Sequence, residues 1–544
     1  MFKTGHLSAR RTFQYGFVAG ILLMAGYAQA LTPYTACKQS LKAPLDVWSS
    51  GWSREYSQRR MYSEQEAGLT AADLSSLEVA WTFAFEGAIQ PRSLPAVTSQ
   101  AIFVGSEEGA VFALDRKSGC GYWHFQADDQ VRTAISVGEV SGRWLVFFGD
   151  NTASAYAVDA LSGQLVWKRQ LETLPFSVIT GSPVLYRDSL LVPVSSWSVG
   201  LALNPFGGCC LFRGSVSSLN ALSGELNWQS YTIPEEPKPT YRNWLGGQQY
   251  GPSGAGVWSS PTVDEKRQRL YVGTGQNYSS PASNTSDAIL AFDLATGKML
   301  WSKQVLPEDA WNVACEFSWL SPNCPKEDGQ DYDFGAPPML ITRPDGKDVI
   351  VTGTKGGMAY AFDPDNNGHI LWQASVGRGG VVGGIHWGMA ATAEYAYAAV
   401  ADTDAALLSS GITPGEPKPG LNKLDLDDGK VIWHSSTRQV CDGKSKKCRT
   451  GLSAAITGIP GAILAPGLDG VLRAFSDETG KLLWAFDSTV ATQAVNGLEA
   501  QGGTLDAGGV VATHGMLIFN SGYGGLISAG GMEGNVLWVL RKKK

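Results

Sequence analysis

The stretch AFDLATGKMLW (residues 291–301) decides the fold of this chain, because the same pattern recurs along most of its length. A small residue, Asp or Asn, a loop containing Gly, and an apolar run ending in Trp make up each copy. Other copies are ALDRKSGCGYW (113–123), AVDALSGQLVW (157–167), SLNALSGELNW (218–228), AFDPDNNGHILW (361–372), KLDLDDGKVIW (423–433) and AFSDETGKLLW (474–484). Each copy predicts a strand, a turn with Gly at positive φ, and a second strand whose Trp packs against the next unit.

Partial copies extend the pattern in both directions, with LSSLEVAW ending at Trp81 and GNVLW ending at Trp538. Eight intervals separate successive Trp residues of the repeat, and we interpret each interval as one blade. Short strands with a period of this size are typical of radially repeated sheets. The sequence therefore predicts an all-β, eight-bladed β-propeller with Trp-docking motifs, forming a single domain over 31–544. Loop insertions in the longest intervals are expected to carry the functional site.

The first 30 residues have the features of a secretory signal peptide. Lys3, Arg10 and Arg11 precede the apolar run 17–25, and Ala28-Gln29-Ala30 fits a cleavage site. Arg10-Arg11 leaves twin-arginine export open beside the general secretory route. We therefore expect a periplasmic or secreted protein with no membrane span after processing. The formal net charge of −7 disfavours nucleic-acid partners.

Eight cysteines in an exported chain suggest disulfides. Cys315 with Cys324 and Cys441 with Cys448 are close enough in sequence to staple loops, which leaves Cys37 with Cys120 and the adjacent pair Cys209-Cys210. A vicinal disulfide offers a flat, polarizable surface, and Trp258 is a candidate for an aromatic plate opposite it. The alternative for Trp258 is packing within a blade. The sequence has no C-x-x-C-H haem attachment motif, so electrons would leave through a separate partner.

Two carboxylates and a lysine stand at the end of the longest insertion, as Asp331-Tyr332-Asp333 and then Lys355 in VTGTKGGMAYAFD. Carboxylates with a nearby lysine suit a metal ion and a general base. Solvated loop residues are the alternative interpretation of this pattern.

With these residues in view, the chain resembles the quinoprotein alcohol dehydrogenases that bind pyrroloquinoline quinone, and within them the polyvinyl-alcohol-dehydrogenase-like branch. The resemblance runs from about Asp46 to Trp538. Its most specific pieces are RSLPAVTSQAIFVGSEEGAVFALD (92–115), VRTA (131–134), CCLFRGSVSSLNALSGELNWQSYTIPEEPKP (209–239), GPSGAGVWSSPTVD (251–264), YVGTGQNYS (271–279), DYDFGAPPML (331–340) and GGTLDAGGVVATHGMLIFNSGYGG (502–525).

The resemblance implies roles for individual residues. Asp331 would be the general base on the substrate hydroxyl, and Asp333 an extra metal ligand of the kind associated with lanthanides rather than calcium. Lys355 would contact the quinone oxygens, with the cofactor lying between Trp258 and the Cys209-Cys210 disulfide. Further contacts to the cofactor would come from Arg92, Arg132, Thr180, Ser195, Arg213 and Trp387.

The implied reaction is oxidation of an alcohol, small or polymeric and expected to be secondary, by hydride transfer to the quinone. An external carrier such as a cytochrome c would accept the electrons. Substrate choice would depend on the inserted loops 234–250 and 310–330.

The metal site departs from the family pattern at two positions. Ser198, followed by Val199, stands where the family has a metal-binding Glu, and Gln276 stands where the family has an Asn ligand. Gln276, Asp331 and Asp333 are therefore the expected ligands of a calcium or lanthanide ion.

Loss of the Glu also raises two alternatives, a non-catalytic scaffold and, with less support, a sugar-binding propeller. His386 in GGIHWGMA is interpreted as structural, with contact to substrate or proton relay as the alternative.

Overall fold

The computed structural model describes residues 34–403, 415–441, 447–524 and 531–543. The expected signal peptide, 1–30, lies outside these residues. Residues Tyr34–Lys544 form one compact unit. No helix in the described part of the chain has the length and apolar character needed to cross a bilayer.

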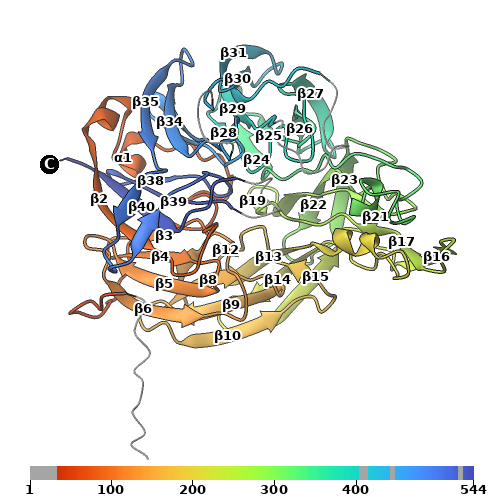
Figure 1. Cartoon of the computed structure of the whole chain (residues 1–544), viewed down its shortest axis with the longest axis horizontal. Helices are drawn as coiled ribbons and strands as arrows, with labels where there is room; N and C mark the ends of the chain where they lie inside the picture. The colour runs from red at the N-terminus through yellow and green to blue at the C-terminus, as the bar shows by residue number, and fades with distance from the viewer. Residues whose placement is uncertain (1–33, 404–414, 442–446, 525–530, 544) are drawn as a thin grey trace, which may run out of the picture. The chain divides into compact units, whose positions relative to one another are not determined.

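Eight antiparallel sheets follow one another around a central axis in the described residues (Figure 1). In each sheet the last strand lies at the rim, as the labels β6, β10, β27 and β31 in Figure 1 show. The first four sheets comprise β1 (Val47–Ser49) with β3 (Ala96–Thr98), β4 (Ala101–Gly105), β5 (Ala110–Asp115) and β6 (Gly121–Gln126); β7 (Ser136–Val140), β8 (Arg143–Gly149), β9 (Ser154–Asp159) and β10 (Leu165–Gln170); β11 (Ser177–Val178), β12 (Val184–Tyr186), β13 (Ser189–Ser196), β14 (Ser215–Asn220) and β15 (Leu226–Tyr231); and β19 (Thr262–Asp264), β20 (Arg269–Gly273), β22 (Ala288–Asp293) and β23 (Met299–Gln304).

The remaining four sheets are β24 (Met339–Thr342), β25 (Asp348–Gly353), β26 (Met358–Asp363) and β27 (His369–Ser375); β28 (Ala390–Ala391), β29 (Tyr395–Val400), β30 (Gly420–Asp425) and β31 (Val431–Ser436); β32 (Thr457–Ile459), β33 (Ala462–Pro466), β34 (Val471–Ser476) and β35 (Leu482–Asp487); and β38 (Val511–Thr513), β39 (Met516–Ser521), β40 (Val536–Lys542) and β2 (Leu77–Ala84). Smaller elements are α1 (Glu64–Ala67), η1 (Ala71–Ser76), η2 (Ser198–Leu203), η3 (Val313–Cys315) and the strand pairs β16 (Lys238–Arg242) with β17 (Gln248–Gly251), β18 (Ser253–Gly254) with β21 (Asn277–Ser279), and β36 (Ala491–Gln493) with β37 (Glu499–Gln501).

The eighth sheet closes the propeller by joining the two ends of the repeat. Strand β2 pairs antiparallel with β40, from Leu77 opposite Lys542 to Ala84 opposite Val536. The predicted all-β, eight-bladed propeller is thus confirmed. The interpretation of Trp538 as a further copy of the repeat is wrong, because Trp538 lies on the third strand of this blade, opposite Thr82 of β2. The fourth strands of the eight blades carry the Trp residues from Trp81 to Trp484.

The repeated Trp packs against the repeated Gly of the following blade. A Cβ atom on Gly163 would lie 2.6 Å from the ring of Trp123, and one on Gly297 would lie 2.5 Å from the ring of Trp228. In several copies the Trp indole also donates to a backbone carbonyl of the next blade, for example from Trp123 Nε1 to Ala160 O at 2.9 Å; the other donors are Trp81, Trp167, Trp228 and Trp372. The motif therefore connects blades as well as forming hairpins.

The segment from Gly51 to Ala67, which we call the strap, crosses one end of the axis. Its backbone bonds to six blades. The N–H of Gly51 donates to Ile135 O, and backbone carbonyls of the strap accept from the N–H groups of Val263, Leu340, Ala391, Gly458 and Gly515. Arg60 of the strap is buried and donates to Ile456 O at 2.8 Å, Thr457 Oγ1 at 2.9 Å and Gly508 O at 3.1 Å. This end of the axis is therefore closed by the chain itself.

All eight cysteines form disulfides in the pairs considered from the sequence. The bonds join Cys37 to Cys120, Cys209 to Cys210, Cys315 to Cys324 and Cys441 to Cys448.

Candidate active site

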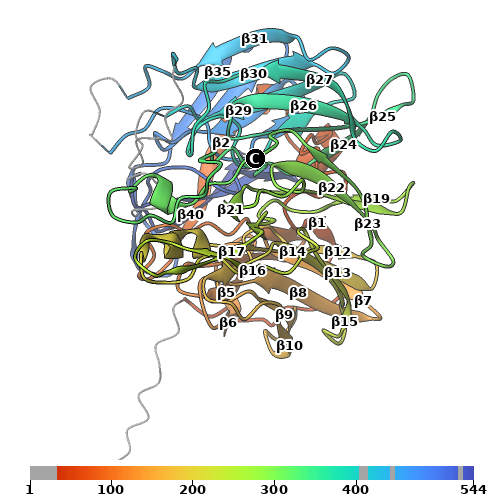
Figure 2. The same cartoon turned by 90° about the vertical axis from the view of Figure 1, so that its right-hand side faces the viewer.

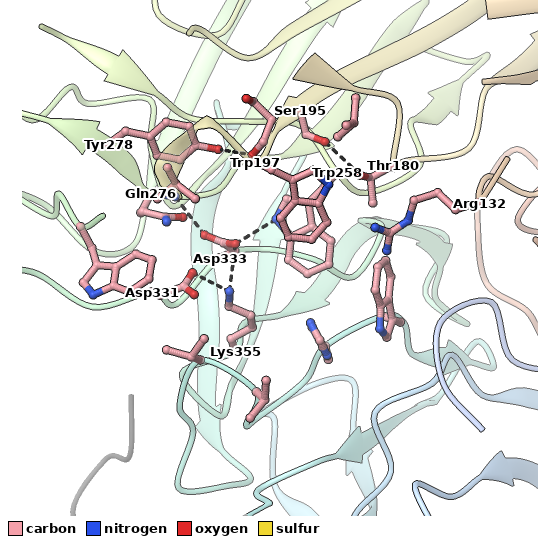
Figure 3. Close-up of a pocket in the computed structure, with 18 of the residues that line it drawn as sticks. Arg132, Thr180, Ser195, Trp197, Trp258, Gln276, Tyr278, Asp331, Asp333 and Lys355 are labelled. Atoms are coloured by element: carbon pink, nitrogen blue, oxygen red, sulfur yellow. Dashed lines mark hydrogen bonds and ion pairs between the residues drawn. The ribbon is translucent and has the colours of Figure 1, made fainter. Parts of the chain in front are cut away.

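A pocket of about 180 Å³ lies where loops of six blades meet near the axis (Figure 3). Most of these loops lead into or out of inner strands, so side chains far apart in sequence converge there. The residues lining it are Arg132, Val178, Thr180, Ser195, Ser196, Trp197, Val199, Trp258, Gln276, Tyr278, Trp311, Asp331, Asp333, Lys355, Val381, Val382, His386, Trp387 and Tyr523.

Asp331, Asp333 and Lys355 form a buried ionic cluster in this pocket. Lys355 Nζ lies 2.5 Å from Asp331 Oδ1 and 3.1 Å from Asp333 Oδ2. Asp333 also accepts from Trp258 Nε1 at 2.9 Å and from the backbone N–H of Gln276 at 3.0 Å. Figure 3 shows the three charged groups pointing toward one another beside the Trp258 ring. Asp333 thus fixes both the lysine and the indole.

Burial governs the ionisation of this cluster. Burial raises the pKa of Asp331 to about 7, although the neighbouring Lys355 ammonium opposes that shift. For Lys355, burial alone would lower the pKa, but Asp331 and Asp333 outweigh it and raise the pKa above its ordinary value. Near neutral pH the lysine is charged and Asp331 is poised to exchange a proton, as a general base requires.

On the other side of Trp258, the pocket is lined by the positively charged side chain of Arg132. The guanidinium of Arg132 lies 5.3 Å from the ring centre of Trp387, and its Nη1 is buried with no hydrogen-bond partner among the described residues. Burial, and then the charge of nearby Arg92, lower the pKa of Arg132 to about 10. A buried guanidinium nitrogen without a partner suits an anionic ligand group.

His386 lines the pocket and is neutral. Burial, with Lys355 and Arg132 nearby, lowers the pKa of His386 to about 3. Its Nδ1 lies 2.8 Å from Ser453 Oγ. Its ring meets the Trp258 ring edge-on, with centres 5.5 Å apart.

The floor of the pocket is an aromatic column. The Trp258 and Trp387 rings meet edge-on at 5.2 Å, and Trp387 lies 6.4 Å from Trp52 of the strap. This column connects the pocket to the strap and gives the pocket an aromatic base.

The side chains present fit a planar, polycarboxylated quinone. Trp258 offers an indole platform, Lys355 an ammonium, and Arg132 a buried donor without a partner, while Thr180 and Ser195 contribute hydroxyls 3.1 Å apart. These are the donor types that carboxylates and quinone oxygens require.

The oxygen donors for a metal ion are fewer. The two oxygens of Asp333 already accept from Gln276, Trp258 and Lys355, so this carboxylate serves protein donors. Asp331 Oδ2 and the Gln276 amide oxygen accept no hydrogen bond from the described residues. Two such donors are well short of the six to eight oxygens that calcium takes. The residues present therefore do not form a complete calcium site.

The structure brings most of the sequence-predicted residues together. Those that line the pocket are Arg132, Thr180, Ser195, Trp258, Gln276, Asp331, Asp333, Lys355 and Trp387.

Five sequence-predicted residues lie outside the pocket lining. Cys209 and Cys210 are buried in a cluster with Phe212 and Tyr278, and the disulfide does not line the pocket opposite Trp258 as expected. Tyr278 occupies the adjacent pocket wall, and Cys210 Sγ lies 4.0 Å from its backbone oxygen.

Arg213 also lies outside the pocket. It donates to Ile233 O and Pro234 O at 3.1 Å and stacks on Tyr231. Ser198 is buried at the start of η2, while its neighbours Trp197 and Val199 line the pocket. Arg92, expected near the cofactor, stacks on Tyr523 behind the pocket wall.

Several lining residues were not predicted from the sequence. Tyr278 lies in YVGTGQNYS and Trp197 directly precedes Ser198, so both adjoin motifs that were recognised. Tyr523 lies in the quoted stretch 502–525 and Trp311 in the inserted loop 310–330, but neither was singled out as a site residue. The fold brings both into the pocket that Trp258 lines.

Comparison with known proteins agrees with this geometry. Residues 50–317 match the family described as glucose/ethanol/alcohol dehydrogenase, β-propeller domain. Residues 212–439 and 354–539 match the outer membrane protein assembly factor BamB, which fits the shared repeat.

Two curated relatives match nearly the whole chain. The chain is 38% identical to a polyvinylalcohol dehydrogenase of a Pseudomonas species over 90% of this chain and 76% of that protein. It is 35% identical to a polyvinylalcohol dehydrogenase of Sphingopyxis sp. over 92% and 77%, respectively. Among solved structures, a quinohemoprotein alcohol dehydrogenase from Comamonas testosteroni shares the fold, with a TM-score of 0.63 and 18% identity over 91% of this chain and 80% of that one.

Proposed function

Because the chain belongs to the pyrroloquinoline-quinone-dependent alcohol dehydrogenase family, we propose that it is an exported enzyme that oxidises a secondary alcohol to a ketone. The observation that carries this proposal is the buried cluster of Asp331, Asp333 and Lys355 against Trp258. The quinone, when bound, supplies the acceptor for the hydride. The four disulfides support export, because such bonds persist in oxidising compartments.

The reaction requires one proton and one hydride to leave the alcohol. Asp331 would take the hydroxyl proton, and its raised pKa matches a base that works near neutral pH. Lys355, held by Asp333, would place its positive charge where negative charge develops on the acceptor's oxygen. The alcohol carbon would lose its hydride as the carbonyl forms. An external carrier such as a cytochrome c would later accept the two electrons that left the alcohol with the hydride.

The other pocket residues would bind and orient. Trp258 would support the planar ring, while Arg132, Thr180 and Ser195 would hold its carboxylates. The aromatic column below Trp258 keeps water from that face. The convergence of these groups favours the enzyme over the non-catalytic scaffold.

Reconstitution with pyrroloquinoline quinone tests the proposal. We expect the mature protein to bind the cofactor and to reduce a dye with secondary alcohols, with calcium or lanthanum added in separate assays to test whether turnover needs an ion. Asp331→Asn should lower kcat by about 10²- to 10⁴-fold, because it removes the base while keeping the side-chain shape. Cofactor binding, followed by absorbance, should change only a few-fold.

Asp427→Asn provides the matched control, because Asp427 is exposed and far along the chain from the cluster. Its activity should equal that of the unaltered protein. Full activity in Asp331→Asn would show that Asp331 is not the base, and failure of the unaltered protein to bind the quinone would refute the function itself.

A further inference from the structure

Three exposed aromatic side chains stand on neighbouring loops at one side of the molecule. The exposed fractions of Phe206, Trp244 and Trp319 are 72%, 80% and 81%. Phe206 follows η2, Trp244 lies in the turn between β16 and β17, and Trp319 follows η3. Figure 1 shows β16 and β17 at the edge of the molecule, and Figure 2 turns that side to the viewer. We call these three residues the aromatic rim.

The loops under the rim are joined by a buried amide network. Asn323 Oδ1 accepts from Asn243 Nδ2 at 2.7 Å and from Gln249 Nε2 at 2.8 Å. Asn323 Nδ2 donates to Ala202 O and Asn204 O, both at 3.0 Å. The Cys315–Cys324 disulfide closes the loop that carries Trp319. The network therefore joins the three loops that carry the exposed rings.

Two chain segments run from the pocket to the rim. Trp197 and Val199 line the pocket, and the same loop continues through Leu201, which is also exposed, to Phe206. Trp311 lines the pocket as well, and its chain continues through η3 to Trp319. Two loops therefore lead from the catalytic cluster to the rim.

We propose that the aromatic rim docks a neutral hydroxylated polymer with a hydrocarbon backbone and holds the segment beside the hydroxyl that enters the pocket. This inference rests on the proposed function. Exposed indole and phenyl faces pack against CH and CH₂ groups without requiring charge on the ligand. Holding one part of the chain raises the local concentration of its other hydroxyls at the pocket. The relatives named polyvinylalcohol dehydrogenases point to a substrate of this chemistry.

Chain-length dependence tests the docking. Steady-state kinetics would compare polyvinyl alcohol of graded lengths with a short secondary alcohol, using a dye as electron acceptor. In the Trp244→Ala/Trp319→Ala double variant, the KM for long polymer should rise by about three- to tenfold, as loss of two ring contacts predicts. The kcat, and the KM for the short alcohol, should be unchanged. Leu482→Ala, an exposed apolar residue on the outer strand β35, is the matched control.

A direct binding measurement separates this inference from the proposed function. Fluorescently labelled polyvinyl alcohol should bind the cofactor-free protein, and the double variant should bind it three- to tenfold more weakly. Equal polymer binding by both proteins would overturn the docking even if alcohols are oxidised. A double variant changed only in its KM for a cytochrome c would mean that the rim serves the electron carrier, which also overturns it.

Discussion

At the scale of single residues, the ionisation of Asp331 sets when the site can work. Its pKa is raised to about 7 by burial, so the carboxylate form needed for a base is lost as the pH falls below neutrality. We therefore expect kcat/KM for alcohol oxidation to decline with unit slope below about pH 7. The positive charge of Lys355 keeps the pKa of Asp331 from rising further, because Lys355 Nζ lies 2.5 Å from Asp331 Oδ1.

Replacement of Lys355 should move the acid limb of that profile. Lys355→Met removes the charge that favours the Asp331 carboxylate, so the limb should shift to higher pH, whereas Lys355→Arg should leave it nearly in place. The limb position is read from pH–rate profiles, independently of the reduced maximum rate. A limb that stays in place in Lys355→Met would assign it to another group.

The sequence predicted the chemistry of this cluster better than its geometry. Asp331, Lys355 and Trp258 were found because motif resemblance identifies residue types at aligned positions. The resemblance did not predict that Asp333 would have both oxygens occupied by protein donors. The resemblance places Cys209-Cys210 against the cofactor, and in the structure the pair packs in one cluster with Tyr278, which lines the pocket. Such placements depend on how loops pack across blades, which local sequence does not encode.

At the scale of elements, the contact between Trp and the next Gly explains why the hairpin motif repeats so strictly. Gly297 has a φ of +72°, and a Cβ there would lie 2.5 Å from the Trp228 ring. Gly346 has a similar φ of +82° but no atom within 4 Å of the corresponding position. The two glycines therefore separate the cost of the backbone conformation from the cost of the steric clash.

Alanine at both positions measures that difference. Gly346→Ala should destabilise the protein by about 1 kcal/mol, from the left-handed backbone alone. Gly297→Ala should cost about 1–3 kcal/mol more, because the Trp228 ring has to move. Denaturant unfolding of both variants under the same conditions checks this. Equal losses would mean that the blade contact tolerates a methyl group.

The repeat also shows where counting along the sequence misleads. The number of blades was predicted correctly, because the last hairpin of each blade carries one Trp of the repeat. Trp538 was counted as a repeat, although it lies on a third strand beside β2. The pairing of β40 with β2 in the eighth blade is not visible from spacing, since the two strands lie at opposite ends of the chain.

At the scale of the whole molecule, the strap links blades that have no strand pairing with one another. Arg60 supplies much of this link through its buried guanidinium. Arg60→Met should destabilise the fold by about 3 kcal/mol or more, because several buried acceptors lose their donors. Arg59→Met, which removes only the partly exposed pair with Glu55, should cost about 1 kcal/mol or less. Unfolding monitored by Trp fluorescence compares them, and similar losses would argue against a structural role for the strap.

Closure by β2 and β40 has a consequence for how the molecule is made. The earliest strand of the repeat acquires its partner only when the last strand has left the ribosome, and the strap meets acceptors on blades that are synthesised after it. Until β40 is available, β2 therefore stays an unpaired strand edge. Closure of the ring is thus one of the latest pairings open to the chain during synthesis, and it depends on the single strand Val536–Lys542.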